Sequence, residues 1–141
     1  MSEFTFQMLL QSHYSGSGNN IDHLHVEQLV DGDWQVFELN TRSPGFDIFM
    51  YAILTCQHTY FRMNAAERGL ILDSSEGLIT VNANDHRSIE ALHVDFTGRL
   101  KNGTVTDDAV AFIKQRMALC PVSINLKKIP DVRTTLSFEP A

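Results

Sequence analysis

Apolar side chains recur every three or four residues between Ser43 and Gly69, and this spacing predicts one long helix. The repeating positions are Phe46, Phe49, Met50, Ile53, Leu54, Tyr60 and Phe61. We expect Ser43 to act as the N-cap, Pro44 to take the first helical position and Gly69 to end the helix. A helix this apolar should be buried on more than one side, by a sheet, a second helix or a partner chain.

Short segments rich in aliphatic and aromatic residues predict three strands before this helix. They are Glu3–Gln11, His23–Val30 and Trp34–Leu39. The composition of Ser12–Asn20 indicates a turn, so the first two strands should pair as a hairpin, and a second turn is expected at Asp31–Asp33.

The same pattern predicts further strands after the helix. They are Leu70–Asp73, Gly77–Val81, a strand within Arg87–Arg99 and a last strand at Val132–Phe138. We expect the polar run Ser74–Glu76 to interrupt the first two of these.

A second helix is predicted to start at Thr106, which is a suitable N-cap followed by two acidic residues. Its apolar positions are Val110, Phe112, Ile113, Met117 and Leu119. Pro121 disfavours helical geometry in the residue before it, so Cys120 should lie at a kink or at the helix end, and a further helical turn can follow through Leu126. The order of elements predicts an α+β fold, and the length predicts a single domain over residues 1–141.

Composition narrows the classes of partner. The net charge of −6 argues against nucleic acid or an anionic membrane surface as the main partner. No apolar run is long enough to span a bilayer, and the N-terminus lacks the features of a secretion signal, so we expect a cytoplasmic protein.

The two cysteines of the chain, Cys56 and Cys120, each lie in an apolar run. In a reducing compartment such a pair is more often free thiols or a redox couple than a structural bridge. Both could also be small buried hydrophobic residues without chemistry, since free cysteine is among the most buried residue types.

Two segments resemble the OsmC/Ohr family, the osmotically inducible and organic-hydroperoxide-resistance proteins of bacteria. Pro44–Ala52, which leads to Cys56, is similar to the family's start of the central helix, and Cys120–Ser123 is similar to its distal Cys-Pro-x-Ser. The resemblance implies an intertwined homodimer in which sheets wrap around the long helices, with a site near the interface. It also implies reduction of organic hydroperoxides, in which one thiolate attacks the peroxide, the second cysteine forms a disulfide, and a dithiol molecule or protein reduces the pair.

The resemblance assigns Cys56 as the peroxidatic thiol and Cys120 as the resolving thiol. Burial raises a thiol's pKa, and Cys56 is too far from the helix start to gain from the helix dipole, so a nearby cation is needed. In the family an arginine on the N-terminal strand, held by the acid at the helix start, supplies it. The first arginine here is Arg42, in the loop before the helix, so Arg42 and Asp47 are the candidate tuning pair.

Asp47 precedes Cys56 by nine residues, about 13 Å along a straight helix and on roughly the opposite face. It could act through Arg42, from a kinked first turn, or on the partner's site.

A second hypothesis is a binding module that holds an apolar small molecule between helices, with the cysteines only lining the pocket. The aromatic residues Phe49, Tyr51, Tyr60 and Phe61 favour it. A divergent family member without chemistry is a third possibility.

No cofactor and no metal are expected. His23 and His25 share one face of a predicted strand, but two ligands make no site. The other histidines, His13, His58, His86 and His93, show no completing spacing. His58 should point away from the Cys56 sulfur, because residues two apart on a helix do not face each other.

Overall fold

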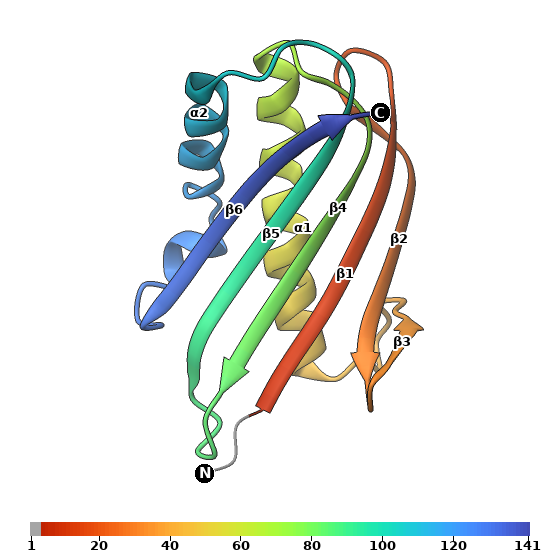
Figure 1. Ribbon diagram of the computed structural model, residues 1–141. Helices are drawn as coiled ribbons and strands as arrows, with labels where there is room; N and C mark the ends of the chain where they lie inside the picture. Colours follow the sequence, from red (N-terminus) through yellow and green to blue (C-terminus); the bar gives the residue numbers. More distant parts are fainter. Residues whose placement is uncertain (1–3) are drawn as a thin grey trace.

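The computed structural model describes residues 4–141 as one six-stranded sheet with two helices on one of its faces (Figure 1). The elements are β1 (Phe4–Ser15), β2 (Asn20–Val30), β3 (Asp33–Val36), α1 (Gly45–Glu67), β4 (Ile71–Ala83), β5 (Ile89–Asn102), α2 (Asp107–Met117), the 3₁₀ turn η1 (Ser123–Asn125) and β6 (Asp131–Pro140). The predicted α+β class is confirmed.

The strand order across the sheet is β3-β2-β1-β4-β5-β6. The pairs β3–β2, β2–β1, β1–β4 and β4–β5 are antiparallel. β6 runs parallel to β5, because α2 and η1 carry the chain back to the starting end of β5 before β6 begins (Figure 1).

The central helix α1 lies across the sheet, and α2 packs beside it (Figure 1). Its buried positions are Met50, Ile53, Leu54, Gln57, His58, Phe61, Asn64 and Ala65. Phe61 stacks on Phe96 of β5 and Phe138 of β6, so the core of the domain lies between α1 and the middle of the sheet. Ile48 and Met63 are 40% and 55% exposed, so one face of α1 is not covered by the part of the chain that the structure describes.

The ends of α1 differ in part from the prediction. Pro44 is the N-cap residue, one place after the predicted N-cap Ser43, and no side chain caps the first turn. The predicted N-cap Ser43 instead accepts a hydrogen bond at Oγ from the backbone N–H of Asn40. Gly69 ends the helix as predicted, with φ at +73°.

The first hairpin is longer than predicted. β1 continues to Ser15 and β2 begins at Asn20, so most of the predicted turn at Ser12–Asn20 is strand. The reason is that Ser12 and His13 pair with β2 on one side and β4 on the other. Glu3, the first residue of the predicted strand, lies outside the described residues.

The predicted interruption at Ser74–Glu76 is wrong. β4 runs without a break and pairs through these residues with both β1 and β5. Ser74 and Ser75 are buried inside the domain, so these polar residues do not mark a surface loop.

α2 begins as predicted, since Thr106 Oγ1 accepts a hydrogen bond from the backbone N–H of Ala109. It ends at Met117, and Cys120 lies shortly beyond the helix, in the region where a kink or helix end was predicted. The helical turn expected through Leu126 is present as η1. The third strand is Asp33–Val36 and not Trp34–Leu39.

Candidate redox site

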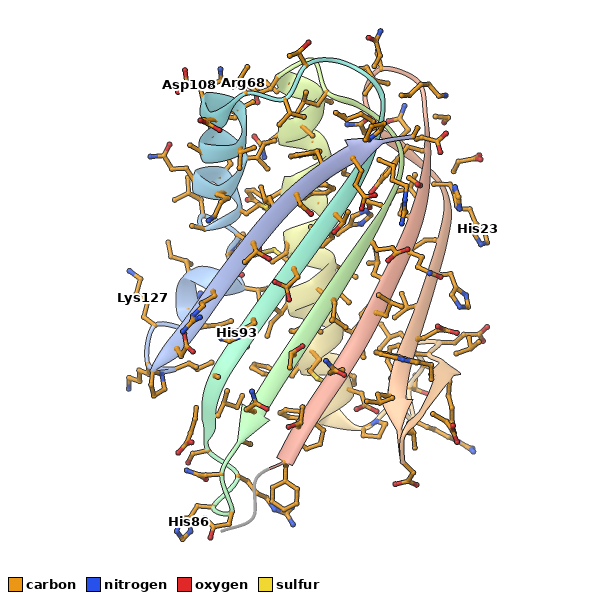
Figure 2. All side chains as sticks on the ribbon, in the orientation of Figure 1. His23, Arg68, His86, His93, Asp108 and Lys127 are labelled. Atoms are coloured by element: carbon orange, nitrogen blue, oxygen red, sulfur yellow. A yellow bond between two sulfur atoms is a disulfide. The ribbon has the colours of Figure 1, made fainter. Side chains whose placement is uncertain are left out.

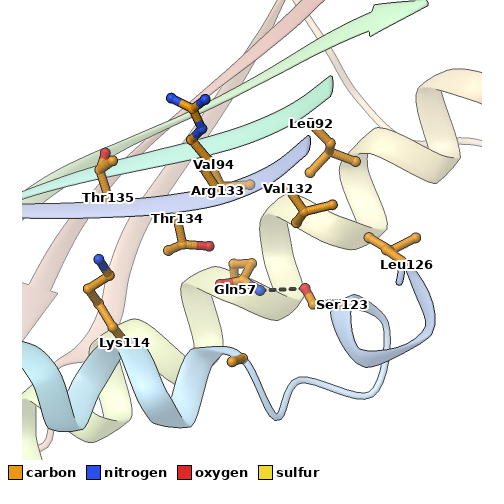
Figure 3. Close-up of a pocket in the computed structure, with 11 residues that line it drawn as sticks. Gln57, Leu92, Val94, Lys114, Ser123, Leu126, Val132, Arg133, Thr134 and Thr135 are labelled. Atoms are coloured by element: carbon orange, nitrogen blue, oxygen red, sulfur yellow. Dashed lines mark hydrogen bonds between the residues drawn. The ribbon is translucent and has the colours of Figure 1, made fainter. Parts of the chain in front are cut away.

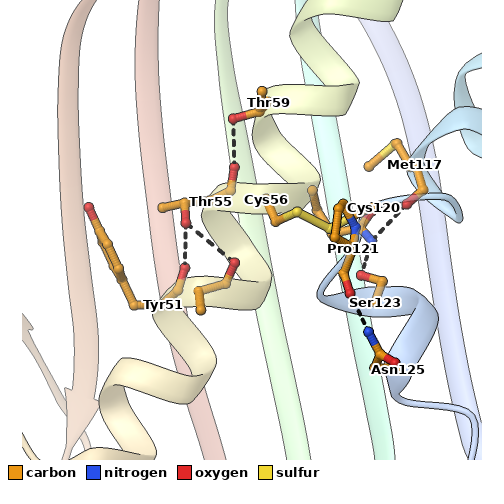
Figure 4. The surroundings of a disulfide bond; sticks show 11 residues. Tyr51, Thr55, Cys56, Thr59, Met117, Cys120, Pro121, Ser123 and Asn125 are labelled. Carbon is orange, nitrogen blue, oxygen red and sulfur yellow. Dashed lines mark hydrogen bonds between the residues drawn. A yellow bond between two sulfur atoms is a disulfide. The ribbon is translucent and has the colours of Figure 1, made fainter.

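A disulfide joins Cys56, in the middle of α1, to Cys120, just past the end of α2 (Figure 4). Their Cα atoms are 6.2 Å apart and the residues are 64 positions apart in sequence. Cys120 is fully buried, whereas Cys56 is only partly buried. The two sulfurs that the sequence singled out are therefore within bonding reach, and Cys56 is the one nearer to solvent.

The turn after α2 holds Cys120 in place. Its backbone N–H donates to the Met117 carbonyl at 3.1 Å, and its own carbonyl accepts from the N–H of Ile124 at 2.9 Å. Pro121 follows directly, and Asn125 Nδ2 donates back to the Pro121 carbonyl at 2.7 Å (Figure 4). The chain thus reverses around the cysteine, which turns its side chain toward α1.

Gln57, the residue after Cys56, joins the same two segments. Its Nε2 donates to the Met117 carbonyl at 3.1 Å and to Ser123 Oγ. No sequence pattern indicated this contact, because a polar residue within an apolar helix is also compatible with a solvent-facing position.

Asp47 lies in the first turn of α1, and its Oδ2 accepts a hydrogen bond from Gln28 Nε2 of β2 at 3.3 Å. It lines a cleft of about 460 Å³ together with Arg87 and the aromatic rings of Phe6 and Phe46. Its place on α1 leaves it about 13 Å from Cys56 along the axis. Within one chain Asp47 is therefore remote from the disulfide.

Arg42 lies in the exposed turn before α1, where its backbone N–H donates to Asn40 Oδ1 at 2.8 Å. Among residues 4–141 its guanidinium forms no ion pair within 4.0 Å. Arg87, which the sequence did not single out, is the cation that shares a cleft with Asp47.

A buried polar cluster lies under the second half of α1. Tyr14 Oη is 2.6 Å from His58 Nε2 and is also hydrogen-bonded to Ser75 Oγ. Burial, and then the positive charge of Arg62, lowers the pKa of His58 to about 4. Burial raises the pKa of Tyr14 against the opposing effect of its hydrogen bond with Ser75. His58 is thus a neutral core residue at neutral pH.

The histidines do not form a single cluster. His23, His86 and His93 project from separate parts of the molecule (Figure 2). His23 faces His13 across two strands with ring centroids 6.3 Å apart. Within residues 4–141, no three or more His, Cys, Asp or Glu side chains are grouped so as to hold a metal ion. None of the helices in the same range is long and apolar enough to cross a bilayer.

The chain is an α+β domain whose long central helix carries one cysteine of a disulfide. The family model described as OsmC-like protein matches residues 40–135, more than half of the chain, and the chain belongs to this family.

Solved structures agree on the fold. An OsmC-like hydroperoxide resistance protein from Jannaschia sp. has 15% identity and a TM-score of 0.58, with 87% of each chain covered. An OsmC-like protein from Mycoplasma pneumoniae has 8% identity and a TM-score of 0.56, covering 82% of this chain and 89% of that one. No curated protein matches the chain in sequence.

Proposed function

We propose that the chain is a thiol peroxidase that reduces apolar organic hydroperoxides in a reducing, cytoplasmic setting. The observation that carries the proposal is the pairing of Cys56 with Cys120 across two helical segments. The description of the similar Jannaschia protein as a hydroperoxide resistance protein supports it.

In the proposed cycle the Cys56 thiolate attacks the outer oxygen of the hydroperoxide, and the O–O bond breaks. The alkoxide takes up a proton and leaves as an alcohol, while Cys56 becomes a sulfenic acid. The Cys120 thiol then attacks the Cys56 sulfur and releases water, which forms the disulfide. A dithiol reductant returns both thiols and becomes a disulfide itself.

The burial of the two cysteines supports this order of events. Cys56 is partly exposed and can meet a peroxide, whereas Cys120 is fully buried and is reached only by the neighbouring sulfur. Thiol reactivity requires access to the reagent as well as a thiolate.

Asp47 acts on the partner's site in this proposal, because α1 is continuous from Gly45 to Glu67 and holds it away from Cys56 of the same chain. The exposed Ile48 and Met63 on α1 are consistent with a homodimer that covers this face. Arg42, or Arg87 in the Asp47 cleft, supplies the cation that favours the thiolate.

The test is a thiol count. The reduced protein is treated with excess cumene hydroperoxide, and free thiols are titrated with and without denaturant. We expect both thiols to disappear as the disulfide forms, and native mass spectrometry should report a dimer. If both thiols remain titratable while the protein stays folded, the proposed activity is wrong.

An apolar-ligand module is the second candidate, favoured by the aromatic cleft of Phe4, Phe6 and Phe46. The pocket expected around Phe61 is replaced by core packing, since that ring stacks on Phe96 and Phe138. A small molecule that co-purifies with the protein, together with thiols inert to peroxide, would favour this reading.

A further inference from the structure

A second cleft, of about 520 Å³, opens beside the cysteine pair between α1, α2, η1 and the edge of the sheet (Figure 3). Neither cysteine is among the residues that line it. The apolar part of its wall comes from Leu92, Val94, Leu126 and Val132. Six polar side chains distinguish it from a plain hydrophobic groove: Gln57, Lys114, Ser123, Arg133, Thr134 and Thr135. Two of them matter most for binding, Gln57 at its inner end and Lys114 on α2.

Gln57 is 2% exposed, and its amide has a fixed orientation. The Met117 carbonyl can only accept a hydrogen bond, so the atom 3.1 Å from it must be Nε2. The second hydrogen of Nε2 is directed to Ser123 Oγ. Both donors of the amide are therefore used.

The carbonyl oxygen of the same amide is left over. Gln57 Oε1 is buried and has no hydrogen-bond partner among residues 4–141. A buried acceptor without a partner is unfavourable, so a bound molecule with an O–H or N–H group at this point gains a hydrogen bond that the protein itself leaves unmade.

Lys114 offers a positively charged hydrogen-bond donor, whereas Gln57 Oε1 is an acceptor. Its side chain extends from α2 toward β6 on the side of the cleft (Figure 3). No carboxylate of residues 4–141 lies within 4.0 Å of its ammonium group. Arg133 also lines the cleft, but its guanidinium points away from the cleft (Figure 3), and its Nε is paired with Asp131 at 2.9 Å.

We infer that this cleft binds a small hydroxycarboxylic acid with an apolar carbon chain. The hydroxyl donates to Gln57 Oε1, the carboxylate pairs with Lys114, and the chain packs against Leu92, Val94 and Leu126. The site is separate from the disulfide and does not depend on the proposed peroxidase activity, since the ligand does not need to reach a sulfur.

Calorimetric titration of the full chain in its disulfide form tests this with three probes of equal chain length. They are ω-hydroxyoctanoate, octanoate and octanol. We expect octanoate to bind about tenfold more weakly than ω-hydroxyoctanoate, because it leaves Gln57 Oε1 unpaired. Octanol should bind about threefold more weakly, because an exposed cation contributes modestly. Equal affinities for the three probes, or no binding of any, would overturn the inference.

Two variants localise the effect. Lys114→Gln should weaken ω-hydroxyoctanoate about threefold, whereas the control Lys101→Gln, an exposed lysine outside the cleft, should leave it unchanged. Gln57→Met should abolish the preference for ω-hydroxyoctanoate over octanoate. Equal losses of affinity in the two lysine variants would show general charge attraction and would refute the site. This comparison does not depend on whether Gln57→Met folds.

Discussion

Cys56 and Cys120 are linked across 64 residues, and one of the two side chains is fully buried while the other is not. This unequal burial predicts unequal reactivity once the disulfide is reduced. In the reduced, folded protein a small alkylating agent should modify Cys56 several-fold faster than Cys120. Peptide mapping by mass spectrometry after short exposures measures both rates, and equal rates would contradict the assignment of Cys56 as the first thiol to react.

The disulfide should also stabilise the domain. Closing a loop of 64 residues stabilises the folded state by about 4 kcal/mol in the chain-entropy model. Reduction should therefore lower the free energy of unfolding by about this amount, which urea denaturation with and without reductant measures. The double variant Cys56→Ser with Cys120→Ser is the control, since its unfolding curve should not respond to reductant.

The tuning cation can be identified by substitution. If Arg42 favours the thiolate, Arg42→Gln should slow peroxide-driven loss of thiols by roughly tenfold or more, while Arg87→Gln should not. If the cation is instead Arg87, in the cleft with Asp47, Arg87→Gln should slow the reaction and Arg42→Gln should not. Stopped-flow thiol measurements at several pH values separate a raised thiol pKa, which shifts the pH profile, from general damage, which lowers the rate at every pH.

His58 gives the folding free energy a defined pH dependence. Its pKa is about 4 in the folded chain and about 6.5 in the unfolded chain. Between these values the unfolded state binds more protons, so stability is fully present above pH 6.5 and falls as the pH drops toward 4, by about 3 kcal/mol in total. Urea unfolding over this range should show a shallower slope in His58→Gln than in the parent chain. The control His86→Gln, at an exposed site, should keep the parent's slope.

The sequence could predict the order of elements and the two cysteines because both depend on local pattern. Helical spacing identified the long helix, the Cys-Pro step identified its partner segment, and the resemblance supplied the pairing. The disulfide between Cys56 and Cys120 confirms the predicted pairing of the two cysteines. The proposed roles of Asp47 and Arg42 stay predictions.

What escaped prediction depends on contacts between distant strands. Ser74 and Ser75 are typical of a loop by composition, yet pairing on both sides makes them strand. Asp47 meets Gln28 and His58 meets Tyr14 only after the sheet is assembled. The pattern of residue types along the chain contains no information on such partners, so these polar contacts could not be predicted.

The tight contact between Gly77 and Phe96 provides the sharpest test of the core. A Cβ added at Gly77 would lie 2.4 Å from Cε1 of the Phe96 ring, which itself stacks on Phe61 of α1. Since the ring is fully buried and has little room to move, Gly77→Ala should lower the free energy of unfolding by about 1–3 kcal/mol. Gly45→Ala is the matched control, because nothing lies within 4 Å of its added Cβ and the residue begins α1. There alanine should be neutral or slightly stabilising. Thermal and urea unfolding of both variants measure the difference, and an equal response would mean that Phe96 does not pack over β4 as described.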